Sequence, residues 1–213
     1  MRKTLLPLAL FVGLTLWAAA PATRADSAKS SGFFNGKDLD GWEGLMQYWS
    51  VQDGAIVGRT EKDPGHNTFL CSKRKYKDFE LSFEIRLKNG IGNSGVQIRS
   101  RIADPVKFTV AGPQADIGKG WWGKLYEENA RGILSDRSGE PFLKRNDWND
   151  YEIIAVGSRV KTFLNGKACA DLDDPAMSRR GIFALQIHSG PPMEVRFKEL
   201  HLELLPADAR VGR

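Results

Sequence analysis

Three short apolar segments carry the side chains of this sequence that are best placed to do chemistry. In each segment polar residues alternate with apolar ones, so an extended backbone would turn the polar side chains away from the core. The outward positions are Gln97 and Arg99 in the first segment, Gln114 and Asp116 in the second, and Gln186 and His188 in the third. Strands that share one sheet would gather these amides, the guanidinium, the carboxylate and the imidazole on a single face.

An aromatic, glycine-rich segment follows the second of these strands. Trp121, Trp122 and Tyr126 lie within it and are expected to wall the same face. Flat apolar rings beside converging donors and acceptors suit a sugar, whose faces stack and whose hydroxyls need paired hydrogen-bonding groups. The alternative interpretation is a solvated sheet face with the tryptophans packed beneath the loop.

The elements that must position these residues are strands. The segment 79–87 alternates with its odd positions apolar, and Asn165-Gly166 between two apolar runs predicts a tight hairpin. The segment 194–205 changes phase after Phe197, which predicts a β-bulge near Lys198 and Glu199.

No segment keeps a helical period for more than two turns, and residues 125–130 and 175–180 are expected to form short helical turns at most. Regularly spaced strands without intervening helices predict an all-β fold, a two-sheet antiparallel jelly-roll sandwich.

Gly90 to Gly95 matches the dinucleotide-binding fingerprint GxGxxG letter for letter. That fingerprint needs a helix at its third glycine, because the pyrophosphate binds the N-terminal amides of that helix. Residues 96–99 instead predict a strand, so we interpret these glycines as a turn between strands with a special backbone.

The chain matches neither a local metal motif nor a two-carboxylate glycosidase signature. HExxH, CxxC and HxH are absent, as is the Glu-x-Asp-x-x-Glu of laminarinase-type enzymes. His66 lies in a predicted loop and His201 alternates with leucines, which leaves His188 as the candidate histidine. Glu80, Ser82 and Glu84 share one strand face, as outward residues of any half-buried strand do.

The first 25 residues resemble a secretory signal peptide, with a basic start, an apolar run and small residues before a cut after Ala25. We therefore expect a secreted or periplasmic protein with a short linker (26–31), one domain (32–205) and a C-terminal tail (206–213). Removing Arg2, Lys3 and Arg24 lowers the formal charge from +5 to +2, which argues against a nucleic-acid binder. No later apolar run reaches the length of a membrane span.

Two cysteines, Cys71 and Cys169, would share that oxidising compartment. A disulfide between them is one expectation, and two buried thiols that never meet are the other.

The chain also resembles a known family through motifs that occur in the expected order. These are Phe34-Asn35-Gly36-Lys37-Asp38-Leu39-Asp40-Gly41-Trp42, Trp49-x-Val51-x-Asp53-Gly54, Tyr76-x-Asp78-Phe79-Glu80-Leu81, Gly92-Asn93-Ser94-Gly95-Val96, Trp148-Asn149-x-Tyr151-Glu152, Asn165-Gly166 and Gln186-x-His188-x-Gly190. They resemble the 3-keto-disaccharide hydrolase domain family, whose fold is a concanavalin A-like lectin/glucanase jelly roll. Many members carry Tyr-Glu-Val-Gln before the aromatic loop, where this chain has Pro113-Gln114-Ala115-Asp116, so a mechanism that relies on that Glu does not transfer.

The resemblance implies cleavage of a glycosidic bond in a sugar already oxidised at C3. The ketone acidifies the C2 hydrogen, so a base can remove it, the aglycone leaves from C1, and water adds back. No redox-cofactor site is evident, so a separate sugar 3-oxidoreductase would supply the substrate.

For this chemistry we assign His188 or Asp116 as the base and Arg99 as the stabiliser of the enolate, with Glu127 as a reserve acid. Asn93, Gln97, Gln114 and Gln186 are expected to position hydroxyls. A divalent metal held by Asp116 and His188 is the alternative to Arg99 as electrophile. The competing functions are a non-catalytic, lectin-like carbohydrate-binding module that uses the same face and a protein-interaction domain, which would need a large exposed apolar patch.

Overall fold

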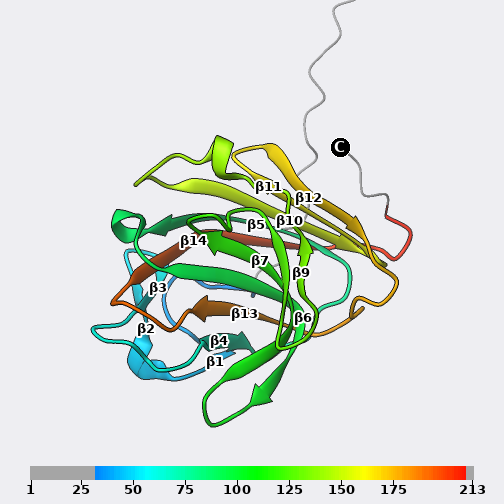
Figure 1. The fold of residues 1–213 in the computed structure, drawn as a ribbon. Coiled ribbons are helices and arrows are strands. Elements are labelled where there is room, and N and C mark those ends of the chain that lie inside the picture. Colours follow the sequence, from blue (N-terminus) through cyan, green and yellow to red (C-terminus); the bar gives the residue numbers. More distant parts are fainter. Residues whose placement is uncertain (1–31, 210–213) are drawn as a thin grey trace, which may run out of the picture.

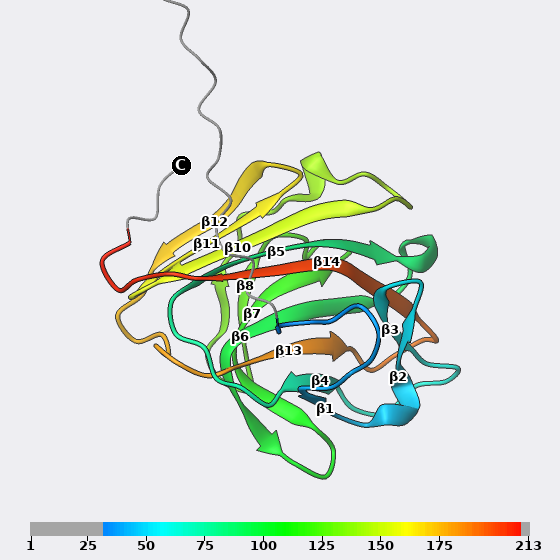
Figure 2. The ribbon, with the colours of Figure 1, turned by 180° about the vertical axis from the view of Figure 1, so that it is seen from behind.

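The strand β5 (Phe79–Leu87) shows how the alternation of the sequence builds the fold. Its odd-numbered residues are buried and its even-numbered residues half-buried, so one face of the strand packs inward. We analysed a computed structural model, which describes residues 32–209 and in which the strands form two antiparallel sheets packed face to face (Figures 1 and 2). The predicted all-β, two-sheet jelly-roll sandwich is confirmed.

The first sheet, which we call the site sheet, contains the three segments that carry the candidate residues. In spatial order its strands are β1 (Trp42–Glu43), β4 (Thr68–Ser72), β13 (Ile182–Ile187), β6 (Asn93–Asp104), β7 (Thr109–Gly118), β8 (Leu125–Glu128) and β9 (Gly132–Ser135). The strands β13, β6 and β7 are direct neighbours, so the expected sharing of one sheet is confirmed.

The second sheet packs against the inner face of the site sheet. In spatial order its strands are β12 (Lys167–Asp173), β11 (Arg159–Leu164), β10 (Asn149–Val156), β5, β14 (Glu194–Leu204), β3 (Ala55–Arg59) and β2 (Trp49–Gln52). Three 3-10 turns lie in the connections: η1 (Met46–Tyr48), η2 (Lys88–Gly90) and η3 (Glu140–Phe142).

The hydrophobic core fills the space between the two sheets. Ile98 and Ile117 of the site sheet meet Ile85, Ile153 and Phe197 of the second sheet there, all fully buried. Each buried side chain of this size stabilises the fold by about 1.5–3 kcal/mol relative to an exposed one. This core fixes which side chains of β6, β7 and β13 remain on the outer face.

Two local predictions are confirmed. Asn165 and Gly166 both have positive φ, 50° and 74°, as the tight hairpin between β11 and β12 requires. The register of β14 against β5 shifts between Lys198 and His201, with Glu199 at φ 51°, which is the predicted bulge.

One prediction is wrong: residues 125–128 form the strand β8, not a helical turn. The other segment, 175–180, begins with a single turn, in which the amide of Met177 donates to the carbonyl oxygen of Asp174, and forms no helix. Cys71 and Cys169 are both free, buried thiols, which excludes the disulfide in this structure. The predicted signal peptide and linker lie outside the described residues, as do residues 210–213 of the tail. Among residues 32–209, no helix is long and apolar enough to cross a membrane.

Candidate functional site

The outer face of the site sheet brings the predicted polar residues into register. Gln97 of β6 lies opposite Gln114 of β7, and Gln114 lies opposite Tyr126 of β8. In the next row on the same face, Asp116 lies opposite Gly95. Because side chains of one strand face repeat every second residue, these rows build a continuous polar surface.

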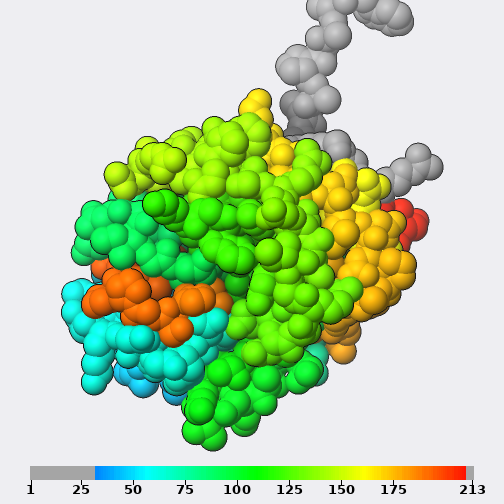
Figure 3. Space-filling model, in the orientation of Figure 1, coloured from blue at the N-terminus to red at the C-terminus, as the bar shows by residue number. Residues whose placement is uncertain are grey.

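A cleft of about 500 Å³ opens on this surface. In the space-filling view the orange segment after β13 borders the green surface formed by the loops around β6 and β8 (Figure 3). The cleft is lined by Asn67, Gly92, Asn93, Gln114, Asp116, Lys119, Trp121, Tyr126, Glu128, Gln186 and His188. Seven of the predicted site residues therefore meet in one place: Asn93, Gln114, Asp116, Trp121, Tyr126, Gln186 and His188.

Gly95 leaves the room that the floor of the cleft needs. A Cβ on this residue would lie 2.4 Å from Cδ of Gln114, so the Gln114 amide lies over the glycine. Gly95 belongs to β6, and the GxGxxG segment opens a strand rather than a helix. The rejection of the dinucleotide fingerprint is thus confirmed.

A buried amide network forms the floor. Nε2 of Gln114 donates to Oδ1 of Asp116 at 2.6 Å and lies 3.3 Å from Oε1 of Gln186, while the amides of Gln114 and Gln97 meet at 2.9 Å. Two buried atoms of the cleft, Oδ2 of Asp116 and Nε2 of Gln186, have no hydrogen-bond partner among residues 32–209. A buried polar atom without a partner costs about 1–3 kcal/mol, and a ligand or water in the cleft that bonded to these two atoms would offset that cost.

Asp116 is the titratable centre of the cleft. Burial raises the pKa of its carboxyl from the ordinary 3.8 to about 7, the hydrogen bond from Gln114 opposes this rise, and the negative charge of Glu128 adds to it. Close to neutral pH this carboxyl exists in both protonation states, which suits a group that gives and takes a proton.

The imidazole of His188 is held by the backbone of the next residue. Its Nδ1 lies 2.6 Å from the carbonyl oxygen of Ser189, so the neutral ring carries its hydrogen on Nδ1 and a lone pair on Nε2. Asn67 anchors the same segment, because its Oδ1 accepts a 3.0 Å hydrogen bond from the amide of Ser189. The other end of the Asn67 amide donates to Oε1 of Glu128 at 3.0 Å.

Arg99 is not part of the cleft, and its predicted position is wrong. The pairing of β6 with β7 shifts between Gln97 and Arg101, and Arg99 has φ 48°, so a bulge reverses the direction of its side chain. The guanidinium is fully buried, donating to Oδ1 of Asp78 at 3.0 Å and to the carbonyl oxygen of Gly157 at 2.7 Å. Burial lowers the pKa of Arg99 to about 10, although the charge of Asp78 opposes this. Arg99 therefore forms a structural ion pair with Asp78.

Three further predicted site residues lie outside the cleft. Glu127 points to the opposite face of β8 and pairs with Arg131, whereas Tyr126 and Glu128 face the cleft. Trp122 belongs to the core between the sheets, which is the alternative considered for the tryptophans. Gln97 is fully buried beside Gln114 on the neighbouring strand, and the two side-chain amides are in contact.

Four lining residues were missed: Asn67, Gly92, Lys119 and Glu128. The alternation of Leu125, Tyr126, Glu127 and Glu128 is the signal that would have identified Glu128, and the helical interpretation of this segment concealed it. Asn67 and Lys119 lie in or beside loops, where no periodicity indicates a direction.

A metal held by Asp116 and His188 would have these two residues as its first ligands, since both line the cleft. Within the part of the chain that the structure describes, no group of three or more His, Cys, Asp or Glu side chains is close enough to hold an ion. Water or substrate oxygens would have to complete such a site.

Comparison with protein families gives a match over most of the chain. The family model described as a 3-keto-alpha-glucoside-1,2-lyase-like domain matches residues 29–203. No curated protein matches this chain.

Solved structures share the fold at low sequence identity. A protein from Parabacteroides distasonis, proposed to be a glycosyl hydrolase, is 19% identical over 81% of this chain and 92% of its own, with a TM-score of 0.61. The carbohydrate-binding module CBM66 from Bacillus subtilis is 21% identical over 76% of this chain and 95% of its own, with a TM-score of 0.59. A Bacillus subtilis protein with a galectin-like fold is 9% identical over 78% and 90%, with a TM-score of 0.52.

Proposed function

This chain belongs to the 3-keto-alpha-glucoside-1,2-lyase-like family, and from that premise we propose that it cleaves the glycosidic bond of sugars oxidised at C3. The observation that carries the proposal is the pair of unpartnered buried atoms, Oδ2 of Asp116 and Nε2 of Gln186, in the cleft that His188 also lines. An acid, an amide donor and a base in one cleft are the three groups that the elimination needs.

In this proposal His188 is the base. Its Nε2 takes the proton from C2, and the electrons of the C–H bond form an enolate with the C3 ketone. Nε2 of Gln186 donates to the enolate oxygen, replacing Arg99 in that role. When the enolate collapses, the C1–O bond breaks, and the leaving oxygen takes the proton of Asp116.

The sugar is then a 1,2-unsaturated 3-ketone. Water adds to C1, its proton passes to the carboxylate of Asp116, and C2 regains a proton from His188. One water is consumed for each bond cleaved, so the net reaction is hydrolysis, and both residues return to their initial states. Trp121 and Tyr126 offer apolar ring surface against which the sugar can stack.

The substrate has to be made elsewhere, because the 3-ketone is already present when the sugar binds. A sugar 3-oxidoreductase is therefore the expected upstream partner. We place both activities outside the cytoplasm, in keeping with the apparent signal peptide.

The direct test uses a 3-keto-glucoside with a chromogenic aglycone beside the unoxidised glucoside. We expect release from the keto sugar alone, and slower release when C2 of that sugar carries deuterium, because the base must break this bond. Deuterium at C2 of the product formed in D₂O would also demonstrate elimination, provided that the proton on His188 exchanges with solvent before it returns. Release from both glucosides would indicate an ordinary glycosidase. A chelator that abolishes release would favour a metal held by Asp116 and His188.

Variants connect the reaction to the cleft. Asp116→Asn and His188→Gln should each lower kcat/KM by about 100-fold or more, the usual contribution of an acid or base. Glu128→Gln, which changes a carboxylate that lines the cleft, should also lower kcat/KM. Glu127→Gln is its matched control, since the two carboxylates are adjacent in sequence and face opposite sides of β8. No release by the wild type, together with saturable sugar binding, would make the domain a lectin-like carbohydrate-binding module.

A further inference from the structure

A second cavity of about 200 Å³ adjoins the cleft. Lys119 lines both, and neighbouring residues of two loops divide between them: Trp121 and Gly92 line the cleft, whereas Trp122 and Gly90 line the second cavity. The two spaces therefore lie on either side of Lys119. The lining residues are Leu87, Asn89, Gly90, Lys119, Trp122, Glu140, Leu143, Lys144, Arg145, Asn146, Asp147 and Asn149.

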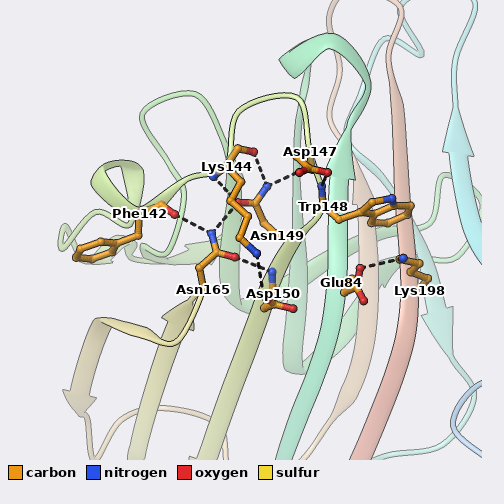
Figure 4. A network of polar contacts seen from close by, with 9 residues as sticks. All are labelled: Glu84, Phe142, Lys144, Asp147, Trp148, Asn149, Asp150, Asn165 and Lys198. Carbon is orange, nitrogen blue, oxygen red and sulfur yellow. Dashed lines mark hydrogen bonds and ion pairs between the residues drawn. The ribbon is translucent and has the colours of Figure 1, made fainter.

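The outer wall of this cavity is a fixed loop. Asn149 is buried at its base, where its Oδ1 accepts from the amide of Lys144 at 2.8 Å and its Nδ2 donates to the carbonyl oxygen of Asp147 at 2.9 Å (Figure 4). Asn165 donates to Phe142 and to Asn149 from the neighbouring hairpin. The loop is thus held at both ends.

The charged side chains that line the cavity differ in whether they have a partner. Nζ of Lys144 is paired with Oδ2 of Asp150 at 3.2 Å. Glu140 and Asp147 have no ion pair among residues 32–209, but each carboxylate is held by a backbone amide, that of Gly120 and that of Trp148. Across residues 32–209, neither Lys119 nor Arg145 has an ion pair or side-chain hydrogen bond.

The floor of the cavity is apolar and its rim carries amides. Leu87, Leu143 and Trp122 give an apolar surface, and Asn89 and Asn146 offer donors and acceptors. Such a mixture suits a sugar ring or a similar small ring with polar substituents.

We propose that the second cavity binds the leaving group and favours one that carries a carboxylate or a phosphate, which Lys119 and Arg145 recognise. The proposal rests on the proposed function, because it assigns the cleft to the oxidised sugar. With Lys144 neutralised by Asp150, the two unpaired cations are the donors that a ligand can engage. Guanidinium and ammonium groups both bind carboxylate and phosphate oxygens through charge-assisted hydrogen bonds.

The test compares three 3-keto-disaccharides that differ in the leaving sugar: glucose, glucuronic acid and glucose 6-phosphate. We expect kcat/KM to be about two- to fivefold higher for an anionic leaving sugar, the range of an exposed ion pair, and to fall toward the neutral value in high salt. Comparing the two anionic sugars shows whether carboxylate or phosphate is preferred.

Arg145→Gln and Lys119→Gln should each remove most of this preference. Lys75→Gln removes one positive charge from an exposed site that lines neither cavity, and it should leave the preference unchanged. Equal kcat/KM for the neutral and anionic substrates would overturn the inference, as would an equal loss in the Lys75 variant, which would indicate long-range attraction rather than a site.

The two proposals fail in different ways. Cleavage of the neutral 3-keto-disaccharide without an anionic preference leaves the proposed function intact and removes the anion site. If no 3-keto-disaccharide is cleaved, the affinity of the unoxidised glucuronic acid disaccharide is measured by calorimetry for the wild type and the Arg145 variant. Weaker binding by the Arg145 variant than by the wild type supports the anion site in the second cavity, and equal affinity overturns it.

Discussion

The side-chain amide of Asn67 donates a 3.0 Å hydrogen bond to Oε1 of Glu128. Asn67 directly precedes β4 and Glu128 ends β8, and three strands separate β4 from β8 in the site sheet. A flat sheet would place those strands nearly 20 Å apart, since neighbouring strands lie about 4.8 Å from one another. The site sheet must therefore curl around its outer face. The hairpin between β6 and β7 takes part, because the carbonyl oxygen of Phe108 accepts from the amide of Phe69 on β4. The cleft is the interior of this curl.

Asn67 accordingly couples two walls of the cleft. We expect Asn67→Ala to lower kcat/KM on a 3-keto-glucoside by about tenfold, because the lost hydrogen bonds release both Glu128 and the segment after His188. Asn67→Asp should lower kcat/KM further, since it places a second negative charge beside Glu128. Steady-state kinetics and thermal unfolding, measured together, separate the effects. A fall in stability with unchanged kinetics would make Asn67 purely structural.

Arg99 should govern stability instead of catalysis. Removing it leaves Asp78 buried without its charged partner, so we expect Arg99→Ala to lower the free energy of unfolding by about 3–5 kcal/mol. Chemical denaturation measures this loss, and Arg101→Ala, at an exposed position on the same strand, is the control. A well-folded Arg99→Ala protein without activity would restore the catalytic role that its burial contradicts.

The sequence predicts the strands better than it predicts the site. Alternation in 79–87, the Asn165-Gly166 turn and the phase change in 194–205 all correspond to local backbone rules, and the structure follows them. The direction of the Arg99 side chain could not be predicted, because a bulge inside β6 reverses it. Neither a glycine nor a change of phase in the sequence signals that bulge. Asn67 meets Glu128 through the curl of a whole sheet, which no local pattern encodes.

Gly95 offers a test of the amide floor. A methyl group there would lie 2.4 Å from Cδ of Gln114, so Gly95→Ala must displace the amide that holds Asp116. We expect a loss of about 1–3 kcal/mol in stability and a large loss of activity. Gly120→Ala is a matched control for the added methyl group, since no atom lies within 4 Å of its Cβ position, although its φ of 81° adds strain of its own. Normal activity in Gly95→Ala would contradict the role of the network.

The raised pKa of Asp116 predicts that the stability of the folded protein falls as the pH rises. Its folded pKa of about 7 lies above the ordinary 3.8, so between these values the folded state binds more protons than the unfolded state. The stabilising contribution is complete below pH 3.8 and is lost as the pH rises through 7, a difference on the order of 4 kcal/mol at most. Asp116→Asn removes this loss, and we expect it to unfold at a higher temperature than the wild type at pH 8 but not at pH 4.

Activity of the wild type should decline on the alkaline side with an apparent pKa near 7, because the acid that protonates the leaving oxygen loses its proton. Glu128→Gln removes the negative charge that contributes to the high pKa, so whatever activity this variant retains should decline at a lower pH. Carbon-13 NMR titration of the Asp116 carboxyl measures the same shift without relying on turnover. A carboxyl that titrates near pH 4 in the folded protein would contradict both its burial and its role as the acid.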